Sequence, residues 1–492
     1  MEAEAVAAPG RDRGLLPATA IAVLAGALYV WTLAPGLMWG DDAELQRFAI
    51  SGGTRNDAHV HPLWLWVATA VARVPVGALP WRVNLTSAIF GALTIGLVFM
   101  VVDRLTRCRE AAALAALALA VSHTLWLHCV RTEVYTVYTA VFALTLLAFV
   151  AWRERQRTPP LLATGFVAGA SLLSHMLIVT AWPGLAIGVW TGAAKGSRLR
   201  ALALFTLGGL AGSLVFVAIA GWMPFLHPVY GKGGPLTILE APRAVELLRC
   251  AAYTLYQFPL GLPLALWGVW RMARTDAPLA LALGLVALGD FAFTLAFRVP
   301  DQYVFFLPAY VVIAVFLGWG IAALPAAGRR PWALAVLAAL LVLAPPLAYR
   351  LAPEVAARAQ ASIVSPRTLP GRDNARFFLD PPKPGERSAE RYAREVFHVL
   401  PESALVVADW APLTPLQYLQ VVEHQRPDVV LLPSRPDYPP QLDSLVAIGG
   451  QRRLFLADDD PPPYYDIDGL SRHFEIRPFG PVFMLLPRSG AP

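Results

Sequence analysis

The first apolar run of the chain is LLPATAIAVLAGALYVWTL at residues 15–33, and similar runs recur along most of the sequence. The run contains no charged side chain, and a helix of about 20 apolar residues is long enough to cross the hydrocarbon core of a bilayer. Arg11 and Arg13 precede it. A secretory signal has a shorter apolar core and a small-residue cleavage site, so we expect an uncleaved first membrane helix.

The composition agrees with a membrane protein. Hydrophobic residues make up 57% of the chain and charged residues 15%, whereas soluble proteins carry about 25% charged residues. Apolar stretches of spanning length recur to about residue 350. We therefore expect a polytopic α-helical membrane protein with about eleven transmembrane helices. The expected spans are 15–34, 84–102, 111–128, 134–152, 161–178, 179–194, 201–222, 247–270, 277–297, 303–324 and 331–349.

The basic residues predict how this bundle is oriented. A net charge of +6 suggests a nucleic-acid partner in a soluble protein, but here the basic residues stand in short clusters between apolar stretches. Lysine and arginine are enriched in cytoplasmic loops, so the alternation of basic and non-basic loops places the N-terminus in the cytoplasm and the C-terminus outside. We expect no nucleic-acid partner. The clusters are Arg11 and Arg13; Arg104, Arg107 and Arg109; Arg153, Arg155 and Arg157; Lys195, Arg198 and Arg200; Arg271 and Arg274; Arg329 and Arg330.

This topology divides the chain into a transmembrane module, residues 1–350, and an extracytoplasmic C-terminal domain, residues 351–492. The module has a long first outer loop at residues 35–83. The C-terminal part, here called the tail, is richer in charge and proline and has no spanning segment. It is expected to form a small soluble α/β domain. Its predicted elements are a buried strand at Ala404–Ala408, a helix at Pro415–Glu423 and a strand at Asp428–Leu432.

Acidic residues cluster just after the first expected span, at Asp41, Asp42 and Glu44. If this segment is helical, Asp41 and Glu44 lie on one face, three residues apart. A carboxylate that is partly shielded from water can act there as a general base on a hydroxyl group. The alternative is an exposed loop with solvated acids, or a helix cap.

Histidine and arginine side chains in the outer loops are further candidates. His59 and His61 stand two residues apart and either bind a metal, contact a substrate or lie in a solvated loop. Arg131 lies on the outer side, against the positive-inside bias. A phosphate ligand, or an interfacial salt bridge with Glu133, explains an arginine there.

A second outer arginine, Arg298, is followed by Asp301, Gln302 and Tyr303. A guanidinium group binds phosphate oxygens in pairs, so Arg298 is the preferred candidate to neutralise a lipid phosphate. The alternative is a surface ion pair between Arg298 and Asp301.

Motifs for nucleotide and hydrolase chemistry are missing from the sequence. It has no GxGxxG in a strand–helix context, no P-loop, no HExxH and no GxSxG. A sugar transferase that faces outward has no access to nucleotide sugars, so it needs a lipid-carried donor. No metal ion is required by such a scheme.

Short blocks in a fixed order carry a family resemblance. They are Pro35-Gly36-Leu37, Gly40-Asp41-Asp42-Ala43-Glu44-Leu45, His61-Pro62-Leu63, Arg82-Val83-Asn84-Leu85, Arg131-Thr132-Glu133-Val134-Tyr135, Arg298 with Asp301-Gln302-Tyr303-Val304-Phe305-Phe306-Leu307-Pro308, Arg372-Asp373-Asn374, Gln417-Tyr418-Leu419-Gln420 and Arg426-Pro427-Asp428-Val429. In these blocks the chain resembles the transmembrane-protein-260-like proteins, a group placed with the protein O-mannosyltransferases in the GT-C superfamily. That group's first-loop motif is an Asp, two small residues, then Glu and an apolar residue.

The resemblance implies a GT-C fold, a lipid-phosphate-sugar donor as co-substrate without a further cofactor, and a catalytic base in the first outer loop. By its place in the motif, Asp41 takes the role of base and Glu44 is the second acid. Asp42 replaces a small residue of the motif, so the choice of base between Asp41 and Asp42 stays open. Residues 57–62 also depart from the group's His-Pro-Pro-Gly-Tyr-Pro stretch.

We therefore expect a glycosyltransferase of the inner (plasma) membrane of a bacterium. It moves a sugar such as mannose from a polyprenyl-phosphate carrier to a hydroxyl of a protein, lipid or glycan acceptor outside the cytoplasm, and its other partners are membrane lipids. The alternatives are a lipid or glycan transporter or flippase, with Asp290 as its main mid-span acid, and a non-catalytic envelope assembly protein. The predicted substrate-contacting residues are Arg298, Arg131, Glu133, His59, His61, Asp301, Gln302 and Tyr303.

Overall fold

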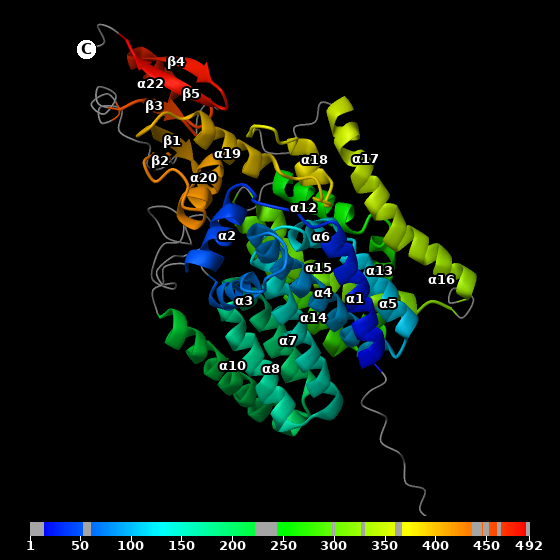
Figure 1. The fold of residues 1–492 in the computed structure, drawn as a ribbon. Coiled ribbons are helices and arrows are strands. Elements are labelled where there is room, and N and C mark those ends of the chain that lie inside the picture. Colours follow the sequence, from blue (N-terminus) through cyan, green and yellow to red (C-terminus); the bar gives the residue numbers. More distant parts are fainter. Residues whose placement is uncertain are drawn as a thin grey trace, which may run out of the picture.

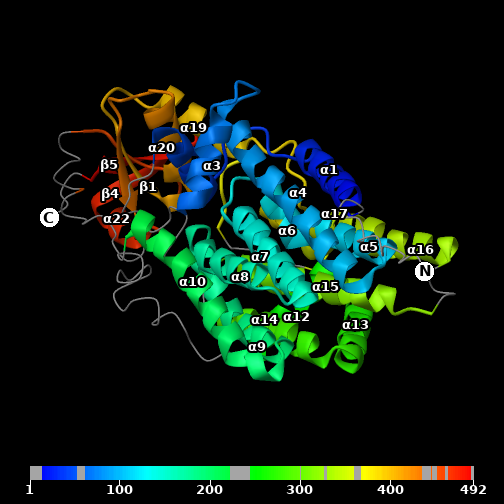
Figure 2. The same cartoon turned by 90° about the horizontal axis from the view of Figure 1, so that it is seen from below.

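The computed structural model of the chain describes residues 14–52, 61–221, 244–297, 299, 301–325, 330–359, 367–434, 445, 452–459 and 464–488. Helices from α1 to α15 form a bundle, α16 and α17 run along one side of it, and the strands gather at one end (Figures 1 and 2). The helices are α1 (Leu15–Trp31), α2 (Asp41–Ser51), α3 (Pro62–Ala72), α4 (Leu79–Thr106), α5 (Arg109–Ala120), α6 (His123–Cys129), α7 (Tyr135–Arg155), α8 (Thr158–Ala170), α9 (Trp182–Gly192), α10 (Arg198–Ala220), α12 (Ala244–Gln257), α13 (Leu262–Thr275), α14 (Ala277–Ala296), α15 (Leu307–Ala322), α16 (Pro331–Ala338) and α17 (Ala344–Arg358).

Six helices of the described residues are long and apolar enough to cross a membrane. They are 79–106, 135–155, 195–220, 277–296, 302–322 and 331–358. The pair α5 and α6, bent by 66°, would make a seventh. Each of the eleven expected spans contains apolar helix, but several of these helices are short or broken. The count of eleven therefore stays a prediction.

The expected span at 247–270 illustrates such a break, because it consists of two helices, α12 and α13. The connection between them contains Pro259 and Gly261, and Pro263 stands in the first turn of α13. Proline lacks a backbone N–H and is disfavoured inside a helix, but it fits the first turn, where that N–H would have no intrahelical acceptor. A new helix therefore begins at this point, although the apolar sequence continues across the break.

Helices α8 and α10 approach each other through glycines spaced four residues apart, Gly165 and Gly169 on one and Gly208 and Gly212 on the other. A Cβ atom added at Gly169 would lie 2.1 Å from the backbone oxygen of Gly209. Small residues at this spacing let membrane helices pack backbone to backbone.

We expect Gly169→Leu to force α8 and α10 apart and to lower stability by about 1–3 kcal/mol, as overpacking does in a close-packed interior. The measurement is the thermal unfolding midpoint of the detergent-solubilised protein. Gly284→Ala is the matched control, because a Cβ atom at Gly284 meets no atom within 4 Å. Equal midpoints for the two variants would contradict the close packing.

The tail contains a five-stranded sheet in the order β2-β1-β3-β5-β4. Strand β1 is parallel to β2 and β3, and β5 is antiparallel to β3 and β4. The predicted strand–helix–strand unit is confirmed as β1, α20 and β2. The elements of the tail are α18 (Asn374–Leu379), α19 (Ser388–Val399), β1 (Leu405–Asp409), α20 (Trp410–Val422), β2 (Val430–Ser434), β3 (Leu454–Leu456), α22 (Ile467–His473), β4 (Phe474–Phe479) and β5 (Val482–Pro487).

One core joins the tail to the first outer loop. Successive residues of a strand point to opposite faces, and Val406 of β1 packs with α19 and α20 on one of them. Leu37, Trp39 and Ala43 of the first outer loop belong to this same core. The indole of Trp39 also donates a hydrogen bond to the hydroxyl of Ser388 over 2.7 Å. Helices α2 and α20 consequently lie against each other (Figure 1).

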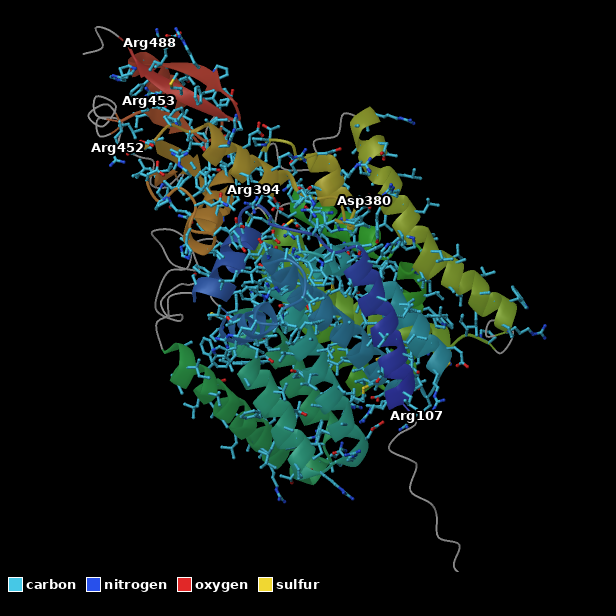
Figure 3. The ribbon with its side chains drawn as sticks, viewed as in Figure 1. Arg107, Asp380, Arg394, Arg452, Arg453 and Arg488 are labelled. Atoms are coloured by element: carbon cyan, nitrogen blue, oxygen red, sulfur yellow. The ribbon has the colours of Figure 1, made fainter. Side chains whose placement is uncertain are left out.

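Arginine side chains mark the two opposite ends of the molecule. Arg107, from the basic cluster after the second expected span, lies at the end of the bundle away from the strands (Figure 3). Arg452, Arg453 and Arg488 lie on the tail at the opposite end. The acidic cluster of α2 is at the tail end of the bundle.

Candidate active site

Helix α2 begins at Asp41, so all three acids of the cluster stand in its first turn. Gly40 precedes the helix with φ of +62°, a conformation that glycine adopts without strain. The positive end of the helix dipole stabilises carboxylates at this place. The side chain of Asp41 is exposed, whereas Asp42 and Glu44 are buried.

Asp41 is held by the tail. Its Oδ1 accepts a hydrogen bond from the indole Nε1 of Trp410 at 2.5 Å. The hydroxyl of Thr414 also donates to the backbone oxygen of Gly40 at 2.9 Å. Because Trp410 and Thr414 both lie on α20, that helix fixes the start of α2 and the direction of the Asp41 carboxylate.

Asp42 points inward to a buried ion-pair network. Its Oδ2 lies 3.3 Å from Nη1 of Arg131, and Nη2 of Arg131 donates to Oε1 of Glu133. Burial raises the pKa of Asp42 well above its ordinary value, and Arg131 offsets only part of that effect. Burial also acts to raise the pKa of Glu133, but Arg131 and a hydrogen bond with His128 bring it below its ordinary value. Glu133 is therefore the more strongly ionised partner of Arg131.

Glu44 has a different partner from Asp41. Its Oε1 lies 3.6 Å from Nη2 of Arg47, one turn further along α2. The two acids predicted to share a face thus differ in both burial and contacts.

An amide network positions the loop that carries Arg131. Nε2 of Gln46 donates to Oδ1 of Asn84 at 2.8 Å, and the hydroxyl of Thr132 donates to the same oxygen at 2.5 Å. Nδ2 of Asn84 donates to the backbone oxygen of Ala34 at 2.9 Å. Asn84 therefore ties the first outer loop to the loop that precedes α7.

Asp301 and Tyr303 belong to the same region. Burial raises the pKa of Asp301 to about 7, and the negative charges of Asp41 and Glu133 add to the increase. The ring of Tyr303 lies 5.8 Å from that of His128. The structure thus brings Asp301 and Tyr303 within electrostatic reach of the acidic cluster.

The remaining predicted residues have other positions. Gln302 donates through Nε2 to the backbone oxygens of Thr294 and Phe297, at 2.7 and 3.1 Å, so it shapes its own turn. The ring of His61 stacks on that of His175, with 4.9 Å between centroids. The predictions for His59 and Arg298 lie outside the described residues.

Sequence reasoning missed two residues of the site. Trp410 lies 369 positions after Asp41, and the sequence contains no signal of that contact. The sequence marks His128 only as a neighbour of the Arg131 loop, yet its Nδ1 lies 3.6 Å from Oε1 of Glu133. Its place one helical turn before the charged Arg131 loop is the feature of the sequence from which its contact with Glu133 could have been predicted.

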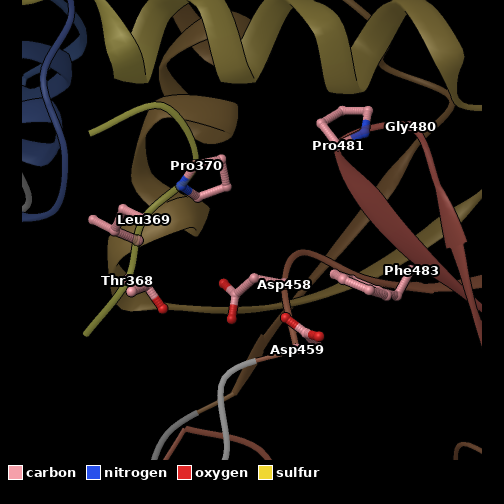
Figure 4. Close-up of a pocket in the computed structure, with 8 residues that line it drawn as sticks. All are labelled: Thr368, Leu369, Pro370, Asp458, Asp459, Gly480, Pro481 and Phe483. Carbon is pink, nitrogen blue, oxygen red and sulfur yellow. The ribbon is translucent and has the colours of Figure 1, made fainter. Parts of the chain in front are cut away.

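The tail contains a second polar site, a cavity of about 340 Å³ (Figure 4). Asp458 on its wall pairs with the buried Arg367 at 2.8 Å, and Arg367 also pairs with Asp409 at 2.6 Å. Burial raises the pKa of Asp409 to about 7 although Arg367 acts to lower it. Asp409 is the last residue of β1, and Asp458 lies two residues after the parallel strand β3. Both therefore lie at the carboxyl ends of parallel strands, where ligand crevices of such sheets lie. The cavity is lined by Thr368, Leu369, Pro370, Asp458, Asp459, Gly480, Pro481 and Phe483.

The site offers carboxylates, guanidinium groups and aromatic rings rather than a ready metal centre. Among the described residues, no group of three or more His, Cys, Asp and Glu side chains could hold a metal ion. An exposed carboxylate beside buried cations suits proton transfer and the binding of an anion.

Comparison with known proteins supports the family resemblance. Residues 60–196 match the family model described as the protein O-mannosyl-transferase TMEM260 N-terminal domain. The protein O-mannosyl-transferase TMEM260 of Mus musculus is 27% identical over 177 residues, which are 35% of this chain. The match spans 25% of that relative's length. The matched family region contains Arg131 and Glu133, whereas Asp41 precedes it.

Solved structures show the fold. ArnT from Cupriavidus metallidurans bound to undecaprenyl phosphate has a TM-score of 0.60 at 15% identity, covering 97% of this chain and 98% of ArnT. Apo ArnT has a TM-score of 0.54 at 16% identity, with coverages of 96% and 97%. The chain is therefore an integral membrane protein with an ArnT-like fold. Its resemblance to the protein O-mannosyl-transferase TMEM260 is confirmed.

Proposed function

We propose that the chain is a GT-C glycosyltransferase. It transfers a sugar such as mannose from a polyprenyl-phosphate carrier to a hydroxyl group of an acceptor. The observation that carries the proposal is the exposed Asp41 carboxylate at the start of α2, directly beside the buried network of Asp42, Arg131 and Glu133. Supporting observations are the O-mannosyl-transferase match and the fold shared with an undecaprenyl-phosphate-bound protein.

Asp41 is the proposed base of the reaction. It accepts the proton of the acceptor hydroxyl while that oxygen bonds to the anomeric carbon of the sugar. The bond from sugar to phosphate oxygen breaks, and polyprenyl phosphate leaves with the electron pair. Asp42 is a poorer candidate for the base, because it is buried and lies 3.3 Å from Arg131. We assign it a positioning role.

Positive charge stabilises the phosphate that leaves, and charge arranged in advance is often the largest catalytic contribution. Arg131 is the described residue proposed for this role, and Arg298 remains a second candidate by its sequence context. Glu133 and Asn84 keep the Arg131 loop in place. The scheme requires no metal ion.

The tail is proposed to hold the acceptor on the extracytoplasmic side of a bacterial plasma membrane. Its cavity combines apolar walls, such as Phe483, with the carboxylates of Asp458 and Asp459 (Figure 4). Apolar walls can contact the apolar surface of a sugar or peptide substrate, and the carboxylates can accept hydrogen bonds from its hydroxyl or N–H groups. The basic clusters and the position of Arg107 opposite the tail support this orientation.

Trp410 is expected to orient the Asp41 carboxylate. Trp410→Phe keeps an aromatic ring but removes the Nε1 donor, so we expect about a tenfold or greater loss of kcat with little change of KM. A hydrogen bond to a charged group contributes about 1.5–3 kcal/mol. The measurement is steady-state transfer from undecaprenyl-phosphate-linked mannose to a peptide or lipid acceptor. Trp31→Phe, at a side chain that is 79% exposed, is the matched control. Unchanged kcat for Trp410→Phe would show that the contact does not matter for the reaction.

A transporter or flippase is the alternative function, and Asp290 is its main sequence feature. In the structure the Asp290 side chain is fully buried, and its Oδ2 accepts a hydrogen bond from the backbone N–H of Ala309 at 3.2 Å. That N–H belongs to the first turn of α15, so Asp290 caps a helix from a neighbouring one. This structural role gives the transport hypothesis no specific support.

A further inference from the structure

Three cationic side chains surround the ring of Phe377, and we call Arg131, Arg372 and Lys383 the Phe377 cluster. The guanidinium carbon of Arg372 lies 4.7 Å from the ring centroid and that of Arg131 5.8 Å. Nζ of Lys383 lies 5.3 Å from the same centroid. Arg131 belongs to the loop after α6, whereas the other two flank α18 in the tail. The cluster therefore joins the membrane bundle to the tail.

Lys383 has a structural role in this cluster. Its Nζ donates hydrogen bonds to the backbone oxygens of Asp380 and, at 2.9 Å, Pro381. The amine thus closes its own turn. Burial lowers the pKa of Lys383 to about 7, so the side chain adds only part of a positive charge to the surroundings at neutral pH.

Arg372 has free hydrogen-bonding capacity. Its Nε donates to Oδ1 of Asn374 at 2.8 Å, and its guanidinium also stacks on Phe378 at 5.4 Å. Within the described part of the chain, its terminal nitrogens form no ion pair. A half-buried guanidinium in this state can still bind an anion bidentately.

Arg131 also has one open donor. Its terminal nitrogens contact Asp42 and Glu133, but its buried Nε has no hydrogen-bond partner among the described residues. One oxygen of Asp42, Oδ1, is likewise buried without a partner there. Buried polar atoms are almost always paired in native structures, so these atoms indicate that a ligand or ordered water belongs beside them.

The balance of charge favours an anion at this place. Because burial raises the pKa of Asp42, Asp42 and Glu133 together carry less than two negative charges opposite Arg131. The acid that acts most on Arg372 is Glu386, which forms no ion pair with it among the described residues, so the positive charge of Arg372 is only partly balanced. Two guanidinium groups beside one ring repel each other in a medium of low dielectric constant, and an anion between them removes that repulsion.

We propose that Nε of Arg131 and the terminal nitrogens of Arg372 bind the phosphate group of a membrane-lipid carrier, with Phe377 holding both guanidinium groups in place. The inference rests on the proposed function and deepens it, because it makes the tail a part of the donor site. Arginine suits this role better than lysine, since its planar fork matches phosphate oxygens.

The test measures binding rather than transfer. The full-length protein in phosphatidylcholine nanodiscs is titrated with undecaprenyl phosphate, and the uncharged alcohol undecaprenol is the comparison ligand. The variants are Arg372→Ala, Arg372→Lys and, as matched control, Arg391→Ala at an exposed arginine of α19. We expect Arg372→Ala to weaken undecaprenyl-phosphate binding about tenfold or more, which corresponds to about 1.4 kcal/mol. Arg372→Lys should be intermediate and Arg391→Ala unchanged, with equal unfolding midpoints.

Two further arms identify the source of the phosphate. Inorganic phosphate and phosphatidylglycerol nanodiscs should compete only weakly. Full competition by either would overturn the assignment to a lipid carrier, and equal binding by Arg372→Ala and the unchanged protein would overturn the site. Asp41→Asn should bind undecaprenyl phosphate normally. If transfer were absent from every assay while binding still depended on Arg372, the proposed function would fail and the phosphate site would stand.

Discussion

Asp41→Asn should abolish sugar transfer while leaving expression and membrane insertion intact. The substitution keeps the size of the side chain and its ability to accept the hydrogen bond from Trp410, but it removes the basic oxygen. General-base catalysis contributes about 10²–10⁴-fold to rate, so residual transfer should be at most about 1%. The measurement is mass spectrometry of envelope proteins and lipids from deletion cells that express each variant.

Two controls make this result specific. Asp468→Asn changes an exposed aspartate in the first turn of α22 and should transfer like the unchanged protein. Asp42→Asn should keep measurable transfer, because that side chain supports Arg131 rather than meeting the acceptor. Transfer by Asp41→Asn together with loss in Asp42→Asn would reverse the assignment of the base. A glycan that depends on the gene but not on either aspartate would favour the non-catalytic assembly role.

Local sequence pattern predicted the elements of this fold well. The apolar runs predicted the positions of the membrane helices, and short apolar segments predicted β1 and β2 with the helix between them. The pattern failed where a short local feature acts within an apolar run. Pro259 and Gly261 separate α12 from α13 although the apolar sequence continues between them. Hydropathy indicates which segments are buried, but it does not show where proline removes a backbone N–H that a helix needs.

The candidate site could be predicted only in part, since it is assembled from distant segments. The acidic cluster and Arg131 were recognisable from their unusual place in the topology. The distant contacts that position these segments were not recognisable: Trp410 lies 369 residues from Asp41, and Asn84 lies 48 residues from Thr132, the neighbour of Arg131. Asp41 and Asp42 are indistinguishable as residue types, and only the helical step between them separates an exposed acid from a buried one. Burial is a property of the tertiary fold, so no local pattern contains it.

Arg131→Met should destabilise the protein strongly, and more than Gly169→Leu does. Methionine fills a similar volume but leaves the carboxyl groups of Asp42 and Glu133 buried without their cation. Removal of one partner from a buried ion pair costs about 3–5 kcal/mol, because the remaining charge is not compensated. The measurement is the unfolding midpoint of the detergent-solubilised protein. Arg391→Met, on the exposed side of α19, is the control for the loss of one arginine.

A rescue experiment separates lost charge compensation from lost packing. If uncompensated carboxylates cause the loss, the triple variant Arg131→Met with Asp42→Asn and Glu133→Gln should be more stable than Arg131→Met alone, because no buried charge is left unpaired. If the triple variant is as unstable as the single one, the packing of Arg131 against Phe377 and its neighbours dominates. Rescue of stability without rescue of transfer is the expected combination, since the methionine restores neither the guanidinium nor its hold on a leaving phosphate.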